Sequence, residues 1–228
     1  MRLSSVNVGN EKPIQNAGKS GKTGTYKRPV GTPVEIISAG LSADTISDTK
    51  NHGGLDQAVY VFGVPDYDWW TERLGYELPP GTFGENLTIS GLESANMSIG
   101  DRLEVGTTVL EVTAPRIPCA TLAARMGDPL FVKRFRQAER PGVYCRVVKE
   151  GTVRAGDAVK IQDPVGGTIP VIEVFRDYFE PQADEKAILR QLAAPIASRA
   201  RKMKEKQLGE LLVRRGEPLK AAPLSERV

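Results

Sequence analysis

Short apolar runs with intervening polar positions dominate the first two thirds of the chain. Segments 33–38, 58–62 and 107–112 are rich in Val, Ile and Thr, and glycine or proline residues lie between such runs. This pattern is typical of β-strands that are separated by turns. Many short strands in one chain predict a barrel or a sandwich, which we expect to extend to about residue 165.

Helical patterns interrupt this β-rich region in two places. We expect a first helix that is capped by Asp66 and ends near Gly75. A second helical stretch is expected within residues 121–138, where a patchy apolar stripe is broken at residues 128–129 by an Asp-Pro pair. Both helices are expected to flank the barrel.

Helix-forming residues dominate the C-terminal part of the chain. Segments 183–192 and 196–212 contain many Ala, Leu, Glu, Lys and Arg residues, which favour helices. We therefore predict two units, a β-rich domain over residues 1–167 and a small helical subdomain with a polar tail over residues 168–228. The fold class that follows is mainly β (α+β).

Charge and apolar content restrict the partners of the chain. The formal charge is +3, from 31 basic and 28 acidic residues, which is too balanced to indicate a nucleic-acid binder. The basic run at 199–206 is explained by a solvated helix face. No apolar run approaches the roughly 18–20 residues that cross a bilayer, and the N-terminus lacks the apolar stretch of a signal peptide. We expect a cytoplasmic protein without a membrane span.

Cys119 is the strongest candidate for chemistry. It directly follows Pro118, whose ring stiffens the local backbone, and Arg116 nearby favours the thiolate form of the cysteine. Cys145 lies in an apolar alternation and is expected to be a buried hydrophobic residue. Two cysteines and one histidine build neither a Cys/His zinc site nor a four-cysteine iron–sulfur cluster. If Cys119 binds a metal, a cofactor must supply most of the other ligands.

Two further motifs suggest a polar cavity. His52 is the only histidine, and its ordinary pKa near neutrality suits proton transfer. A Gly-Gly turn follows it, and Asp56 is expected on the same surface. Glu85 and Asn86 follow a glycine-rich stretch at the start of an expected strand, where polar groups can face a cavity.

Lys27 and Arg28 are paired cations that suit an anionic phosphate or carboxylate, although a solvated loop explains them equally well. Segment 16–23 comes close to a phosphate-binding P-loop, but Asn16 replaces the first glycine. No buried strand precedes this segment and no helix is expected after it, so the pattern does not indicate an NTPase.

Six segments, taken in order, resemble a known family. They are residues 25–30, 52–59, 83–87, 116–119, 142–147 and 151–157. In sequence and spacing they are similar to bacterial MOSC-domain proteins of the YiiM type, which are related to the C-terminal domain of molybdenum cofactor sulfurase. The residues after about 168 also look like the three-helix extension of that branch, so the resemblance covers nearly the whole chain.

The resemblance implies a MOSC-type β-barrel that binds a pyranopterin molybdenum cofactor through Cys119. It implies reduction of N-hydroxylated bases such as 6-hydroxylaminopurine, with electrons from a flavin or iron–sulfur reductase. Lys27, Arg28 and Arg116 are then candidates for binding the phosphate and pterin of the cofactor, while His52, Asp56, Glu85 and Asn86 would line the cavity. Cys119, His52 and Asp56 are the expected catalytic residues.

Two other functions remain open at this level. Cys119 also suits a sulfur carrier or transferase that holds a persulfide, because the same thiolate chemistry serves both. A non-catalytic protein that binds the molybdenum cofactor is the second alternative. The sequence leaves the oligomeric state open, and a homodimer is one expectation.

Overall fold

The computed structural model describes residues 1–15, 21–47, 53–182 and 184–215. Most of the P-loop-like segment and His52 therefore lie outside the described residues. The longer strands are β1 (Leu3–Val8), β5 (Val34–Ile37), β7 (Val59–Gly63), β8 (Leu87–Ile89), β10 (Arg102–Val105), β11 (Thr108–Pro115), β12 (Val143–Lys149), β13 (Gly151–Val153) and β14 (Val159–Gln162). Two-residue strands are β2 (Lys12–Pro13), β3 (Lys22–Thr23), β4 (Arg28–Pro29), β6 (Gly40–Leu41), β9 (Ser98–Ile99) and β15 (Ile169–Pro170).

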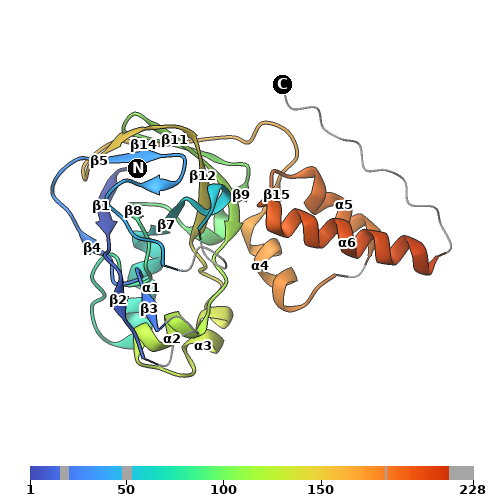
Figure 1. Cartoon of the computed structure of the whole chain (residues 1–228), viewed down its shortest axis with the longest axis horizontal. Coiled ribbons are helices and arrows are strands. Elements are labelled where there is room, and N and C mark those ends of the chain that lie inside the picture. Colours follow the sequence, from blue (N-terminus) through green and yellow to red (C-terminus); the bar gives the residue numbers. More distant parts are fainter. Residues whose placement is uncertain (16–20, 48–52, 183, 216–228) are drawn as a thin grey trace.

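The helices fall into two groups (Figure 1). Those of the first group, α1 (Val64–Leu74), α2 (Ala120–Met126) and α3 (Phe131–Ala138), lie at one end of the β structure. Those of the second group, α4 (Val171–Phe179), α5 (Glu185–Ala193) and α6 (Ser198–Arg214), lie beside it. Short 3-10 helices η1 (Leu55–Gln57) and η2 (Ser94–Asn96) complete the described elements.

The main sheet has eight strands in the order β14-β10-β11-β12-β7-β8-β1-β4. Its neighbours pair antiparallel except β7 and β8, which are parallel and are therefore joined by a crossover that contains α1. Three smaller sheets pair β13-β5-β6, β15-β9 and β2-β3. The fold is thus mixed α+β with a large, mainly β, sheet.

The expected barrel is present only as an incomplete ring, because the described strand pairs form no closed ladder. The N-terminal end of β1 nevertheless meets the start of β14. Leu3 N–H donates to the Asp157 carbonyl at 2.9 Å, Val159 N–H donates to the Met1 carbonyl at 3.0 Å, and an isolated bridge joins Arg2 to Ala158. These few bonds form a seam between β1 and the start of β14.

The expected strands at 33–38, 58–62 and 107–112 are confirmed as β5, β7 and β11. The predicted helix ends as expected, with Gly75 in the left-handed region at φ 78°, but its predicted cap is wrong. The helix begins at Val64, three residues earlier than a cap at Asp66 implies, because Pro65 favours its first turn. Asp66 is buried instead, and its carboxylate accepts from Ser94 N–H at 3.0 Å and from Arg140 at 2.7 Å.

The predicted break at residues 128–129 separates α2 from α3. Both helices pack on a second hydrophobic cluster, which is aromatic and distinct from the aliphatic core of the sheet. This aromatic cluster contains Tyr60, Phe62, Tyr67, Trp70, Phe83, Phe131, Phe135 and Tyr144. Cys119 packs against it, directly before α2.

The C-terminal helices share the main core of the sheet. Val171, Ala194 and Ile196 belong to the same buried cluster as the strand residues. Helices α4, α5 and α6 agree with the three-helix extension that the resemblance implied, although the sequence pattern itself identified only the last two. The basic run on α6 is not wholly solvated as expected, because Lys204 is buried and pairs with Asp177. A domain boundary at residue 167 stays a prediction.

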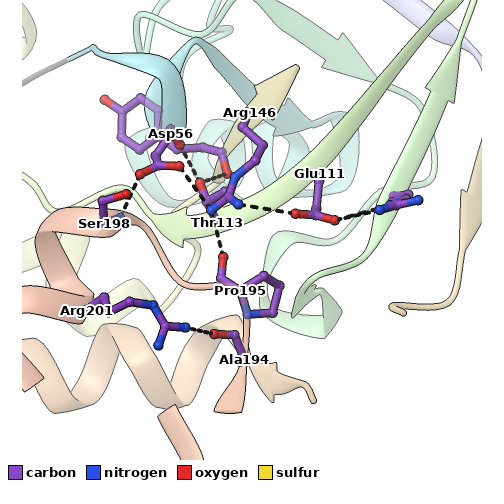
Figure 2. Close-up of polar contacts among 10 residues, drawn as sticks. Asp56, Glu111, Thr113, Arg146, Ala194, Pro195, Ser198 and Arg201 are labelled. Atoms are coloured by element: carbon purple, nitrogen blue, oxygen red, sulfur yellow. Dashed lines mark hydrogen bonds and ion pairs between the residues drawn. The ribbon is translucent and has the colours of Figure 1, made fainter. Parts of the chain in front are cut away.

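A second set of contacts joins α6 to the sheet (Figure 2). The first turn of α6 has no capping side chain of its own, and Asp56 of η1 accepts the Ser198 N–H at 2.6 Å. Asp56 also pairs with Arg146 of β12 at 3.0 Å, and Arg146 donates to the Pro195 carbonyl at 3.0 Å. No helix within the described part of the chain is long and apolar enough to cross a membrane.

Candidate active site

Cys119 lies where the longest strand of the sheet passes into α2. Its backbone is extended at φ −133° and ψ 173°, and its carbonyl accepts the N–H groups of Leu122 at 3.0 Å and Ala123 at 3.2 Å. Its side chain is partly buried. The preceding proline restricts the backbone here, so the strand and the helix together fix the position of the sulfur.

Arg116 is almost fully buried, with 5% of its surface exposed, and it ties this segment to the 83–87 segment. Its Nη1 donates to the Phe83 carbonyl, and its guanidinium lies 5.1 Å from the Tyr60 ring centre. Burial alone lowers the pKa of Arg116, but Tyr144, Tyr60 and Cys119 hold it above its ordinary value. Its Nε is buried and has no hydrogen-bond partner among the described residues.

Lys27 and Asn86 converge on a carboxylate that the sequence did not single out. Lys27 is buried and pairs with Asp44, whose Oδ2 also accepts from Asn86 Nδ2 at 2.9 Å. Burial lowers the pKa of Lys27, and Asp44 partly offsets this effect. Asp44 therefore balances the charge of Lys27, and direct contact of Lys27 with a cofactor phosphate stays a prediction.

Glu85 is fully buried just before β8. Its Oε1 accepts from Tyr67 Oη at 2.6 Å and from Gly81 N–H at 2.6 Å, among other donors. Burial raises its pKa, although these hydrogen bonds act in the opposite direction. Gly84 permits this arrangement, because its φ is 78° and a Cβ there would lie 2.5 Å from Thr25 Oγ1.

Arg125 belongs to the same group and was missed by sequence reasoning. It lies on α2, its guanidinium stacks 4.5 Å from the Tyr26 ring centre, and its Nε is buried without a partner in the described structure. Burial lowers the pKa of Arg125, while Tyr26, Tyr67 and Glu85 act to raise it. Its position six residues after Cys119 on an expected helix was the available signal.

The structure thus brings together Cys119, Arg116, Glu85, Asn86 and Lys27, with Arg28 close enough to Arg125 to lower its pKa. Asp56 instead takes part in the α6 contacts, so its predicted catalytic role stays a prediction. His52 lies outside the described residues. Cys145 is fully buried on β12, as expected, and burial raises its pKa.

No group of three or more His, Cys, Asp or Glu side chains in the described ranges is arranged to hold a metal ion. That a cofactor would supply most ligands to any metal at Cys119 stays a prediction. The Nε atoms of Arg116 and Arg125 have no hydrogen-bond partner among the described residues, so their N–H groups could donate to an anion.

Comparison with known proteins identifies relatives over much of the chain. A model of the MOSC domain matches residues 48–160. YflK of Bacillus subtilis is 38% identical over 152 residues, which cover 67% of this chain and 69% of YflK. A protein named Reductase from Gibberella moniliformis is 33% identical over 145 residues, covering 60% of this chain but only 25% of that protein.

Solved structures share the fold. YiiM from Geobacillus stearothermophilus has a TM-score of 0.74 and 26% identity, with 91% of this chain and 98% of that chain covered. YiiM from Escherichia coli has a TM-score of 0.70 and 22% identity, with 100% of this chain and 98% of that chain covered. This chain belongs to the MOSC-domain family and is of the YiiM type.

Proposed function

We propose that this protein is a molybdenum-cofactor-dependent reductase of N-hydroxylated compounds, with Cys119 as the protein ligand to molybdenum. The observation that carries the proposal is a partly exposed cysteine near the buried Arg116 and directly before the helix of the partly buried Arg125. The Nε of each arginine is buried without a hydrogen-bond partner among the described residues. Membership of the MOSC family and the similarity to a protein named Reductase support the same function.

The residues around Cys119 fit an anionic cofactor. A pyranopterin cofactor carries a phosphate and a dithiolene, and both are electron-rich groups that cationic N–H donors stabilise. Arg116 and Arg125 each present a buried Nε without a partner in the described structure, and Arg28 is exposed nearby. We assign Arg28, Arg116 and Arg125 to the anionic parts of the cofactor. Asn86 is assigned to the same site, and its hydrogen bond to Asp44 fixes the position of its side chain.

When bound, the cofactor would supply the two-electron redox chemistry that removes the hydroxyl oxygen from nitrogen. The overall reaction is R–NH–OH + 2 e⁻ + 2 H⁺ → R–NH₂ + H₂O. Cys119 contributes a soft thiolate, Arg116 favours its ionised form, and the aromatic cluster excludes water from one side of the sulfur. Electrons come from an external flavin or iron–sulfur reductase, because the chain has only two cysteines and no dinucleotide fingerprint.

Cys119→Ser tests the proposal, with Cys145→Ala as the control for loss of a thiol. Both variants and the parent protein are expressed in a host that makes the cofactor, and molybdenum and pterin are measured per chain. We expect near-stoichiometric cofactor in the parent and control, and its loss in Cys119→Ser.

Activity is then measured with 6-hydroxylaminopurine and reduced viologen as an artificial electron donor. Turnover in the parent and its loss in Cys119→Ser support the reductase. Metal-free parent protein that carries a persulfide on Cys119 would instead support a sulfur carrier. Cofactor-loaded protein that turns over no N-hydroxylated compound would support a binding protein.

A further inference from the structure

A cleft of about 700 Å³ lies between α3 and the C-terminal helices. Lys133 lines it from α3, Phe179 from α4 and Gln191 from α5. The buried phenylalanines of α3 belong to the aromatic cluster on which Cys119 packs, so α3 separates the cleft from the cysteine. The volume is in the range of small-molecule sites, and the cleft is distinct from the candidate active site.

Gln191 is a buried polar residue of this cleft whose side chain lacks a partner. Only 4% of its surface is exposed, and its amide forms no hydrogen bond with any residue in the described part of the chain. The amide atoms are not fully enclosed by protein, so they reach the cleft that the residue lines. A buried amide without a partner is unfavourable, and a ligand that offers both a donor and an acceptor would satisfy it.

The same cleft has an aromatic wall. Phe175 and Phe179 line it with ring centres 5.2 Å apart, and Ile169 and Ala187 add aliphatic surface. The guanidinium of Arg136 lies 4.7 Å from the ring centre of Phe179, so this ring already packs against a planar cation. Flat aromatic ligands, nucleobases among them, stack on such side chains.

The charges that line the cleft leave one cation without a carboxylate. Every carboxylate that lines it is paired: the pairs are Glu139–Arg176, Glu173–Arg190, Glu180–Arg136 and Asp177–Lys204. Lys133 is exposed and forms no ion pair with a residue that the structure describes. Its ammonium group therefore suits one anionic group of a ligand, such as a phosphate.

We propose that this cleft binds an adenine nucleotide. Gln191 pairs with the edge of the base, Phe179 packs against the ring and Lys133 contacts the phosphate. Adenine has a ring nitrogen that accepts beside an amino group that donates, and a glutamine amide matches this pair with two hydrogen bonds. The bound nucleotide bridges α3 and the C-terminal helices, and the proposal does not depend on the function proposed above.

Isothermal titration calorimetry of the purified full chain tests the ligand class. We expect adenosine monophosphate to bind with a Kd of about 1 mM or tighter, and adenosine to bind more weakly. Purine riboside lacks the amino group, so it should bind about 10-fold more weakly than adenosine. The proposal is overturned if neither adenosine nor its monophosphate binds at about 10 mM. Inorganic phosphate that binds as tightly as adenosine monophosphate, or purine riboside that binds as tightly as adenosine, also overturns it.

Two variants with matched controls locate the ligand. Gln191→Leu keeps the size of the side chain and removes the amide, so adenosine should bind about 10-fold more weakly. The exposed Gln162→Leu on β14 lies outside the cleft and should bind as the parent does. Lys133→Ala should lose the advantage of the monophosphate over adenosine, whereas Arg134→Ala on the same helix should keep it. Unchanged binding in Gln191→Leu overturns the proposal.

NMR of the isotope-labelled parent gives the same information without a substitution, so the proposal stays testable if Gln191→Leu does not fold. We expect saturating adenosine monophosphate to shift the assigned side-chain amide signals of Gln191. Unshifted signals in the presence of bound nucleotide would place the nucleotide elsewhere and overturn the proposal. None of these measurements uses turnover, so failure here and failure of the proposed reductase activity are separate results.

Discussion

Arg116 carries a buried charge and contacts three separate parts of the structure. It contacts the 83–87 segment by a hydrogen bond, the Tyr60 ring by a cation–π contact and Cys119 by electrostatics. The sequence identified Arg116 as a neighbour of Cys119, but the partners at Phe83 and Tyr60 are distant in sequence. Such contacts depend on strand order, which local patterns do not reveal.

The two cysteines are predicted to differ strongly in reactivity. Cys119 is partly exposed, whereas Cys145 is fully buried and burial raises its pKa, which disfavours the thiolate that reacts. Under native conditions we expect iodoacetamide to modify Cys119 and to spare Cys145. Peptide mass spectrometry before and after denaturation gives the sites, and native labelling of Cys145 at the rate of Cys119 would contradict the assignment.

Loss of the Arg116 side chain is predicted to reduce stability and cofactor binding together. Arg116→Gln removes the donor to a buried carbonyl, and we expect a loss of about 1–3 kcal/mol in the free energy of unfolding. The exposed Arg134→Gln is the control and should change stability by less than about 1 kcal/mol. Urea titration measures both, and pterin content reports binding. Equal stability of the two variants would argue against a structural role for Arg116.

Regular elements were the part of the fold that sequence patterns predicted best. Short apolar runs rich in Val, Ile and Thr identified β5, β7 and β11, and helix formers identified α5 and α6. The sequence pattern did not identify α4, which only the resemblance to a three-helix extension implied. Its first turns contain β-branched residues, whose weak helix preference is overridden by burial of Val171 and Phe175. The cap at Asp66 was mispredicted because a glycine and proline start the helix earlier.

The start of α6 is predicted to depend on a residue 142 positions away in sequence. A carboxylate at the N-terminus of a helix satisfies a free N–H and interacts favourably with the helix dipole. Asp56→Ala removes this contact and also leaves Arg146 without one of its carboxylate partners. We expect a loss of about 1–3 kcal/mol in the free energy of unfolding.

The exposed pair Arg190–Glu173 on the same group of helices provides the control. Arg190→Ala should cost less than about 1 kcal/mol, because exposed ion pairs contribute little. Urea titration compares the two variants, and trypsin digestion under native conditions should cut α6 faster in Asp56→Ala. Similar digestion rates for both variants would show that Asp56 does not hold α6.

Over the whole molecule, the sheet and the C-terminal helices share one core. Ile169 pairs with β9, and Val171, Ala194 and Ile196 lie in the aliphatic cluster of the sheet. Composition distinguished the segments of α5 and α6 from the β-rich region, because helix formers are frequent at residues 183–192 and 196–212. Composition could not show that they are packed together, since burial of these particular side chains depends on tertiary contacts.

Unfolding is therefore predicted to occur in one step. Scanning calorimetry of the full chain should give a single transition whose calorimetric and van't Hoff enthalpies agree. A truncated chain that ends at residue 167 should lose cooperative unfolding, because its aliphatic core would be open to water. Two separate transitions, or a well-folded truncated chain, would favour independent domains.

The seam between Met1–Leu3 and residues 156–159 has a consequence for synthesis of the protein. A chain that emerges from the ribosome with its N-terminus first can pair this end of β1 with β8 on one edge, but its other edge has no partner until residues 156–159 have been made. Closure of the ring is then a late, long-range event, which slows folding and leaves a strand edge exposed meanwhile. Nascent chains of this protein should consequently need protection by chaperones until β14 has left the exit tunnel.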